Sequence, residues 1–191
     1  MGISGEFSTT ASQSITRSDQ IQGVDSTPHI PSYQRSQWLH WVDDDGDCQD
    51  TRQEVLIEES LVEVTYESER QCRVETGLWV DIYTGDRFTD PSDLDVDHFI
   101  PLAEAHESGG WAWDEITKRR FANDLEASGH LIAVSASANR SKGASDPADW
   151  LPPDESAWCF YVRNWSEIKK SWGLDFDDHE NRVINEVLVN C

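Results

Sequence analysis

Hydrophobic and polar residues alternate in several short stretches of the chain, and this pattern predicts strands. Residues 61–66 alternate between apolar and polar side chains, and residues 94–99 and the largely apolar residues 130–135 are two further short candidate strands. Residues 72–83 indicate a pair of strands around the turn-forming Thr76-Gly77. We therefore expect a short antiparallel sheet.

Other stretches repeat their apolar residues at helical spacing. A helix is predicted over 50–59, where Asp50-Thr51 can cap its start, and further helices over 101–107, 114–126 and from Ala138 to about 143–147. Two apolar stripes near the C-terminus are expected to pack into the core: Trp158, Val162, Trp165, Ile168 or Lys169, and Trp172; and Val183, Ile184, Val187 and Leu188. Strands and helices together predict an α+β fold.

The length of 191 residues fits one folded domain with its own core. Residues 1–36 are rich in Ser, Thr, Gln and Asp, so we interpret them as a disordered leader, a mature N-terminus or an expression remnant that contributes nothing to the site. The domain is then 37–191. No run approaches 18 apolar residues, and the N-terminus lacks the basic and apolar segments of a signal peptide, so we expect no membrane association and a signal peptide already removed.

Two segments carry candidate chemistry. The first is Asp95-Val96-Asp97-His98-Phe99-Ile100-Pro101-Leu102, and the second runs from His130 to Gly143 and contains Asn139-Arg140-Ser141-Lys142-Gly143. Hydrolysis of a phosphodiester requires a base, a cation to offset charge on the phosphate oxygens, and positive groups to hold the backbone. These two segments hold residues suited to all three tasks.

Each task has a candidate. His98 is suited to be the base, because imidazole titrates close to neutral pH. Asp97 and Asn139 offer the oxygen ligands that Mg²⁺ prefers, with Mn²⁺ as an alternative. Arg140 and Lys142, with Ser141 between them, can bind a phosphate oxygen beside the metal.

The two segments resemble the HNH family of nucleases, also called the ββα-metal or His-Me finger fold. This resemblance implies a small ββα core, Asp97 and Asn139 as ligands of one divalent ion, His98 as general base, and products with 5′ phosphate and 3′ hydroxyl. The middle motif position is His130, for which it implies a role in steadying the loop or the base. Asp95 is expected to help as a hydrogen-bond acceptor behind the ligands.

A closer resemblance is to the HNH subfamily of secreted nucleases and of the C-terminal domain of GmrSD-type restriction enzymes, over about residues 38–191. It rests on segments 47–52, 77–81, 121–125, 150–153 and 172–174. The sequence therefore predicts a secreted, largely sequence-nonspecific DNA endonuclease that works as a monomer, with RNA as a second possible substrate. Two alternatives stay open: a catalytically idle binding or DNA-mimic domain on an HNH scaffold, and a modification-dependent restriction nuclease, against which the cysteine content argues.

The four cysteines lack the CxxC spacing of a zinc site, so disulfides are the better interpretation. Of the three possible pairings we favour Cys48 with Cys72 and Cys159 with Cys191, because each closes a local unit. Four free buried thiols are the alternative. Disulfides imply an oxidising compartment.

The net charge of −22 is unusual for a protein expected to approach a polyanion. At low salt such a charge repels nucleic acid, whereas at about 1 M salt the screening length falls to about 3 Å. An acidic surface with few lysines therefore indicates a saline environment and a halophilic protein. A surface that avoids nonspecific retention on nucleic acid is the alternative.

The acidic stretch Asp43-Asp44-Asp45-Gly46-Asp47 resembles part of a calcium-binding loop. Trp41 stands where an EF-hand would need its first carboxylate. A solvated acidic turn is the favoured interpretation, and structural Ca²⁺ at Asp43–Asp47 the alternative.

Overall fold

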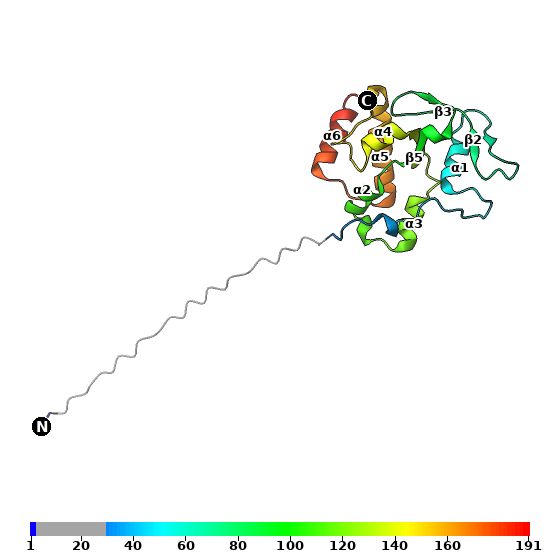
Figure 1. Cartoon of the computed structure of the whole chain (residues 1–191). Helices are drawn as coiled ribbons and strands as arrows, with labels where there is room; N and C mark the ends of the chain where they lie inside the picture. Colours follow the sequence, from blue (N-terminus) through cyan, green and yellow to red (C-terminus); the bar gives the residue numbers. More distant parts are fainter. Residues whose placement is uncertain (3–29) are drawn as a thin grey trace.

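The computed structural model describes residues 1–2 and 30–191 of the chain (Figure 1). Short antiparallel sheets and several helices form the described part, which confirms the α+β class. The helices are α1 (Thr51–Glu58), α2 (Leu102–Glu107), α3 (Glu115–Ala122), α4 (Ala136–Lys142), α5 (Trp158–Trp172) and α6 (Asp178–Leu188). The strands are β1 (Thr65–Tyr66), β2 (Val74–Thr76), β3 (Trp79–Val80), β4 (Arg87–Phe88), β5 (Leu94–His98) and β6 (Leu131–Ser135).

The central unit consists of β5, β6 and the helix α4 that follows β6. Strands β5 and β6 pair antiparallel, with Asp97 opposite Ile132 and His98 opposite Leu131. Helix α4 begins directly after β6, because the Ser135 hydroxyl accepts a hydrogen bond from the Ala138 amide at 3.2 Å and caps the helix. This cap starts the helix two residues before the predicted Ala138. A strand pair followed by a helix therefore places Asp97 and Asn139 on adjacent elements.

Two hydrophobic cores lie on either side of this strand pair. Val96 and Ala133 belong to the core beside α1, β2 and β3, whereas Ile132 and Val134 belong to the core formed with α5 and α6. Figure 1 shows these two groups of elements on opposite sides of β5. Because side chains alternate along a strand, the two faces of β6 fill both cores, which explains why β6 is buried along its whole length.

The strand prediction for 72–83 is wrong in its pairing. Strands β2 and β3 do form there, but β2 pairs with β1 and β3 pairs with β4. Of the predicted strand 61–66, only Thr65–Tyr66 pairs. A Cβ atom at Gly77, between β2 and β3, would lie 2.5 Å from the Trp79 ring, so the chain passes too close to that ring for any side chain.

The folded domain begins before the predicted boundary at residue 37. The imidazole Nε2 of His106 donates a hydrogen bond to the carbonyl oxygen of Pro31 at 2.7 Å, and Tyr33 packs edge-on against the same ring. Trp38, after the short 3-10 helix Arg35–Gln37, is fully buried. Residues 31–36 therefore belong to the domain; the predicted leader over 3–29 lies outside the described residues.

Two disulfides join Cys48 to Cys72 and Cys159 to Cys191, which confirms the favoured pairing. The first ties the loop before α1 to the segment before β2. The second ties α5 to the C-terminus after α6. Both link elements on the periphery of the two cores.

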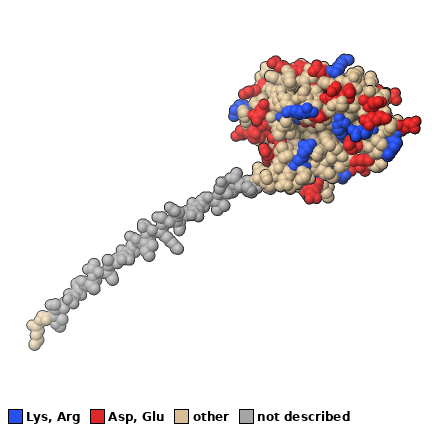
Figure 2. All heavy atoms as spheres, in the orientation of Figure 1, with Lys and Arg blue, Asp and Glu red and all other residues tan. Residues whose placement is uncertain are grey.

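The described surface is strongly acidic. Figure 2 shows carboxylates over much of the visible face, with Lys and Arg in small separate groups. Among the described residues, no helix is long and apolar enough to cross a membrane.

Candidate active site

An open cleft of about 360 Å³ lies where β5, the start of α2 and α4 meet the N-terminal segment. Residues of both predicted motifs line this cleft, together with Tyr33 and Arg35, which precede the predicted domain boundary at residue 37. The lining residues are Tyr33, Arg35, Val96, Asp97, His98, Pro101, Leu102, Ala103, Asn139, Arg140, Gly143 and Ala144.

Asp97 is held by two buried donors. Its Oδ2 accepts hydrogen bonds from the Tyr83 hydroxyl at 2.8 Å and from the Lys142 ammonium at 2.5 Å. Burial raises the pKa of the Asp97 carboxyl, and the Lys142 charge opposes this rise. The second oxygen, Oδ1, has no hydrogen-bond partner among the described residues. It is the oxygen that remains available to a ligand in the cleft.

Asn139 is oriented by Asp95. The Asn139 amide Nδ2 donates a hydrogen bond to the Asp95 carboxylate at 3.1 Å. Because an amide carries its donor and its acceptor on opposite sides, this bond directs the carbonyl oxygen Oδ1 away from Asp95. Asp97 and Asn139 therefore each keep one oxygen free of partners in the described part of the chain.

His98 is fixed as a neutral imidazole. Its Nε2 lies 2.9 Å from the Ala122 carbonyl oxygen at the end of α3. A carbonyl oxygen only accepts, so Nε2 carries the proton and Nδ1 keeps its lone pair. Burial lowers the pKa of His98 to about 3. The Nδ1 atom makes no hydrogen bond with any residue that the structure describes.

Trp41 covers the His98 ring. The two rings stack with centroids 5.1 Å apart and an interplanar angle of 28°, and His40 lies edge-on to His98 at 5.9 Å. Trp41 adopts a φ of 56°, in the left-handed region that is uncommon for a residue with a large side chain. The backbone before α1 thus turns sharply to bring this ring onto His98.

His130 lies behind the cleft. It is fully buried, and its Nε2 donates to the Phe121 carbonyl oxygen at 2.7 Å. Its ring packs edge-on against the Phe121 ring, and burial lowers its pKa. His130 therefore cannot touch a substrate, and its position suits the supporting role that the family resemblance implies.

The three consecutive residues predicted to bind substrate separate in the structure. Arg140 is exposed and lines the cleft. The Ser141 hydroxyl instead accepts a hydrogen bond from the Trp150 indole at 3.2 Å and does not line the cleft. Lys142 is 1% exposed and is bonded to Asp97 and to the His98 carbonyl oxygen. The prediction that Lys142 and Ser141 bind a phosphate is therefore not supported.

Four residues in or beside the cleft were not predicted from the sequence: Tyr33, Arg35, His40 and Trp41. Tyr33 and Arg35 line the cleft although they fall within the predicted leader, and the expectation that this segment contributes nothing to the site is wrong. Their signal in the sequence is the density of aromatic residues from Tyr33 to Trp41, which a disordered segment rarely carries.

The acidic stretch Asp43–Asp47 forms an exposed turn. Carboxylate oxygens of Asp43, Asp45 and Asp47 lie within 4.8 Å of one another. These carboxylates already accept backbone amide hydrogens, for example Asp43 from Gly46 at 2.8 Å and from Cys48 at 3.0 Å. The bonds account for the shape of the turn as a solvated acidic loop.

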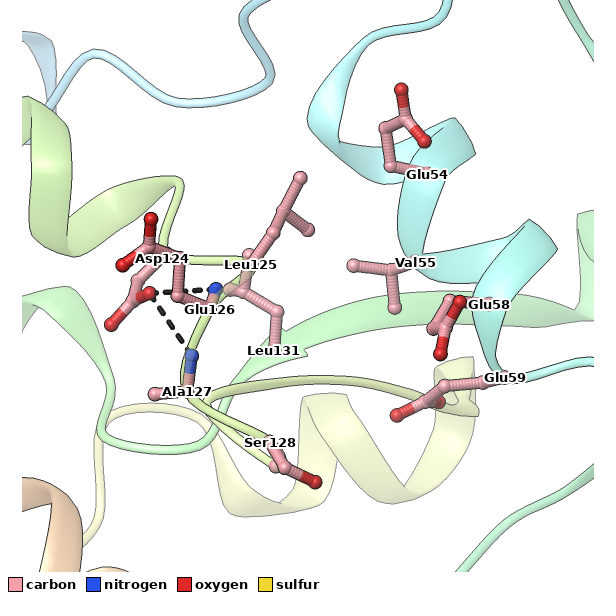
Figure 3. A pocket seen from close by; sticks show the side chains of 11 residues that line it. Glu54, Val55, Glu58, Glu59, Asp124, Leu125, Glu126, Ala127, Ser128 and Leu131 are labelled. Carbon is pink, nitrogen blue, oxygen red and sulfur yellow. Dashed lines mark hydrogen bonds between the residues drawn. The ribbon is translucent and has the colours of Figure 1, made fainter.

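A second cavity, of about 490 Å³, is larger but has the wrong charge for a polyanion. Figure 3 shows the carboxylates of Glu54, Glu58, Glu59, Asp124 and Glu126 around it. Glu59 accepts a hydrogen bond from the Ala133 amide at 2.6 Å, and burial raises its pKa to about 7. The acidic lining of this cavity is unsuited to bind a polyanion, unlike the lining of the smaller cleft with Arg35 and Arg140.

Comparison with known families agrees with the resemblance of the two motifs. Residues 50–187 match the family of GmrSD restriction endonucleases, C-terminal domain, and the chain belongs to this family of nuclease domains. It is also 33% identical to an "Uncharacterized secreted protein" of Arthroderma benhamiae, over 92% of this chain and 85% of the relative. No solved structure matches the chain.

Proposed function

We propose that this protein is a metal-dependent endonuclease that hydrolyses the phosphodiester backbone of DNA with little sequence preference, with RNA as a second possible substrate. One observation carries the proposal: the Nε2–H of His98 is bound to the Ala122 carbonyl oxygen, so the lone pair of Nδ1 is left for a proton in the cleft that Asp97 and Asn139 also line. A base and two oxygen ligands in one cleft are what hydrolysis of a phosphodiester needs.

The donor atoms suit a hard divalent cation. Asp97 and Asn139 each have one oxygen without a protein partner among the described residues, and Mg²⁺ or Mn²⁺ is commonly held by one or two such ligands together with water and substrate phosphate. When bound, the ion would stabilise negative charge on the phosphate and on the departing 3′ oxygen.

The remaining steps belong to side chains of the protein. His98 Nδ1 accepts a proton from the attacking water. Because burial lowers the pKa of His98 to about 3, the imidazolium that forms needs stabilisation by the Ala122 carbonyl oxygen and by the negative charge of the phosphate in the cleft. Arg140 binds a non-bridging phosphate oxygen. Lys142 and Tyr83 hold the Asp97 carboxylate in place from behind, and Asp95 does the same for Asn139.

We further propose that the enzyme is secreted and acts in a saline medium. Secretion is supported by the two disulfides and by the description of the relative from Arthroderma benhamiae as a secreted protein. The saline medium is supported by the net charge of −22, because salt screens the repulsion between this surface and DNA.

One observation favours a second candidate, the catalytically idle domain. Lys142 already compensates the charge of Asp97, which lowers the gain from binding a cation there. Such a domain would bind its partner without binding a divalent ion, and calorimetric titration with Mn²⁺ separates the two candidates.

The deciding experiment is cleavage of plasmid and single-stranded DNA by the wild type and by His98→Ala, with Mg²⁺ or with EDTA, at about 0.1 M and at 2 to 3 M salt. We expect metal-dependent cutting that the variant loses and that increases with salt. A folded wild type that cuts under none of these conditions contradicts the proposal and favours the idle domain.

A further inference from the structure

The cleft is locally positive although the protein is strongly acidic. Its lining includes two guanidinium groups, Arg140 from α4 and Arg35 from the N-terminal segment, and a single carboxylate, Asp97. The charge of Asp97 is compensated by Lys142 from the protein interior. The two arginines are therefore the unopposed charges of the lining in a chain with a net charge of −22.

We propose that Arg35 is a substrate-binding residue that contacts a phosphate of the nucleic-acid backbone beside the scissile bond. The inference rests on the proposed nuclease function and deepens it. It makes the N-terminal segment a wall of the substrate site and gives Arg35 the task that the sequence suggested for Lys142.

The position of Arg35 is fixed by a chain of hydrogen bonds. Its Nη2 lies 3.1 Å from His40 Nε2, and His40 Nδ1 lies 2.8 Å from the Trp38 carbonyl oxygen. Because the carbonyl only accepts, Nδ1 carries the proton and Nε2 accepts from Arg35. Trp38 is fully buried, so the guanidinium is anchored to the core while the side chain remains exposed.

This anchor places Arg35 next to the proposed base. His40, which accepts from Arg35, lies edge-on to the His98 ring with centroids 5.9 Å apart. Arg35 also forms no ion pair with a carboxylate of the described chain, whereas Arg119 is paired with Asp44 and Arg73 with Glu67. A preorganised guanidinium with free donors is suited to bind a phosphate oxygen.

The test compares Arg35→Ala and Arg35→Lys with Arg182→Ala, a control that removes the same charge from an exposed position on α6, outside the cleft lining. The probe is a fluorescein-labelled 16-base-pair DNA duplex with Mg²⁺, and KM and kcat are measured at several KCl concentrations. Thermal melting of each variant checks that it is folded.

For Arg35→Ala we expect KM to increase about tenfold with kcat changed less than about threefold, and the slope of log KM against log salt to fall by about 1. Arg35→Lys should restore the slope, and Arg182→Ala should leave both values unchanged. Unchanged KM and slope in Arg35→Ala, beside an active wild type, overturn this inference alone. An equal effect of Arg182→Ala also overturns it, whereas an inactive wild type overturns the proposed function itself.

Discussion

His98 and His130 donate their Nε2 protons to the carbonyl oxygens of two consecutive residues, Ala122 and Phe121, at the C-terminal end of α3. The last carbonyl groups of a helix lack hydrogen-bond donors within the helix, and here two imidazole N–H groups are the donors. One imidazole reaches the cleft and the other lies wholly in the core. The same helix end thus orients the proposed base and steadies the strand β6 behind it.

This arrangement predicts different effects for the two histidines. His98→Ala should lower the cleavage rate by at least about 10²-fold, because the proton acceptor is lost. His130→Ala should mainly lower the free energy of unfolding, by about 2 to 4 kcal/mol, because it leaves a cavity and an unpaired carbonyl. Urea unfolding and cleavage assays on both variants check this, and a His130→Ala variant that is stable but inactive would contradict it.

The bond between Asp95 and Asn139 predicts an effect on the metal requirement. Asn139→Ala removes an oxygen ligand, and Asp95→Ala frees the Asn139 amide to rotate. Both variants should raise the Mg²⁺ concentration for half-maximal cleavage, Asp95→Ala by on the order of tenfold. Cleavage measured across a Mg²⁺ series gives the answer, with Asp93→Ala, exposed before β5, as control. An unchanged requirement in Asn139→Ala would mean that the ion binds elsewhere.

The buried pair of Lys142 and Asp97 predicts a large loss of stability when Lys142 is replaced. Lys142→Met leaves the Asp97 charge buried without its partner, which should lower the free energy of unfolding by about 3 to 5 kcal/mol. Lys170→Ala, at an exposed position of α5, should change it by less than about 0.5 kcal/mol. Chemical denaturation compares the two. Equal effects would show that Lys142 does not hold Asp97.

How much the sequence could predict is clear from these residues. The two motifs and their short strand-like stretches were sufficient to predict β5, β6 and the helix carrying Asn139, because local patterns determine these elements. The burial of Lys142 could not be predicted, because it depends on how α4 packs onto β5. Arg35 and Trp41 reach the cleft through contacts between segments distant in sequence, and no local pattern encodes such contacts. The pairing of β2 and β3 with different partners depends on tertiary packing in the same way.

The disulfides predict a loss of stability on reduction. They join residues 24 and 32 positions apart, and in the chain-entropy treatment each loop of this size contributes about 3 to 4 kcal/mol. The double variants Cys48→Ser/Cys72→Ser and Cys159→Ser/Cys191→Ser should each lose about this amount. Thermal unfolding with and without reductant measures it, and a melting temperature unaffected by reductant would refute the expectation.

Glu59 predicts a pH-dependent stability, separate from the cleft. Burial raises its pKa from 4.5 to about 7 in the folded protein, so between these values the unfolded chain loses the proton while the folded chain keeps it. Below about pH 4.5 Glu59 is protonated in both states and does not lower the free energy of unfolding. As the pH rises to about 7, Glu59 lowers the free energy of unfolding progressively, by at most about 3 kcal/mol.

Glu59→Gln keeps an acceptor for the Ala133 amide and removes this loss of stability. It should raise the melting temperature at pH 8 relative to the wild type and leave it unchanged at pH 4. Glu167→Gln, at an exposed position of α5, is the control, and an equal gain from Glu59→Gln at both pH values would show that burial of the charge is not the cause.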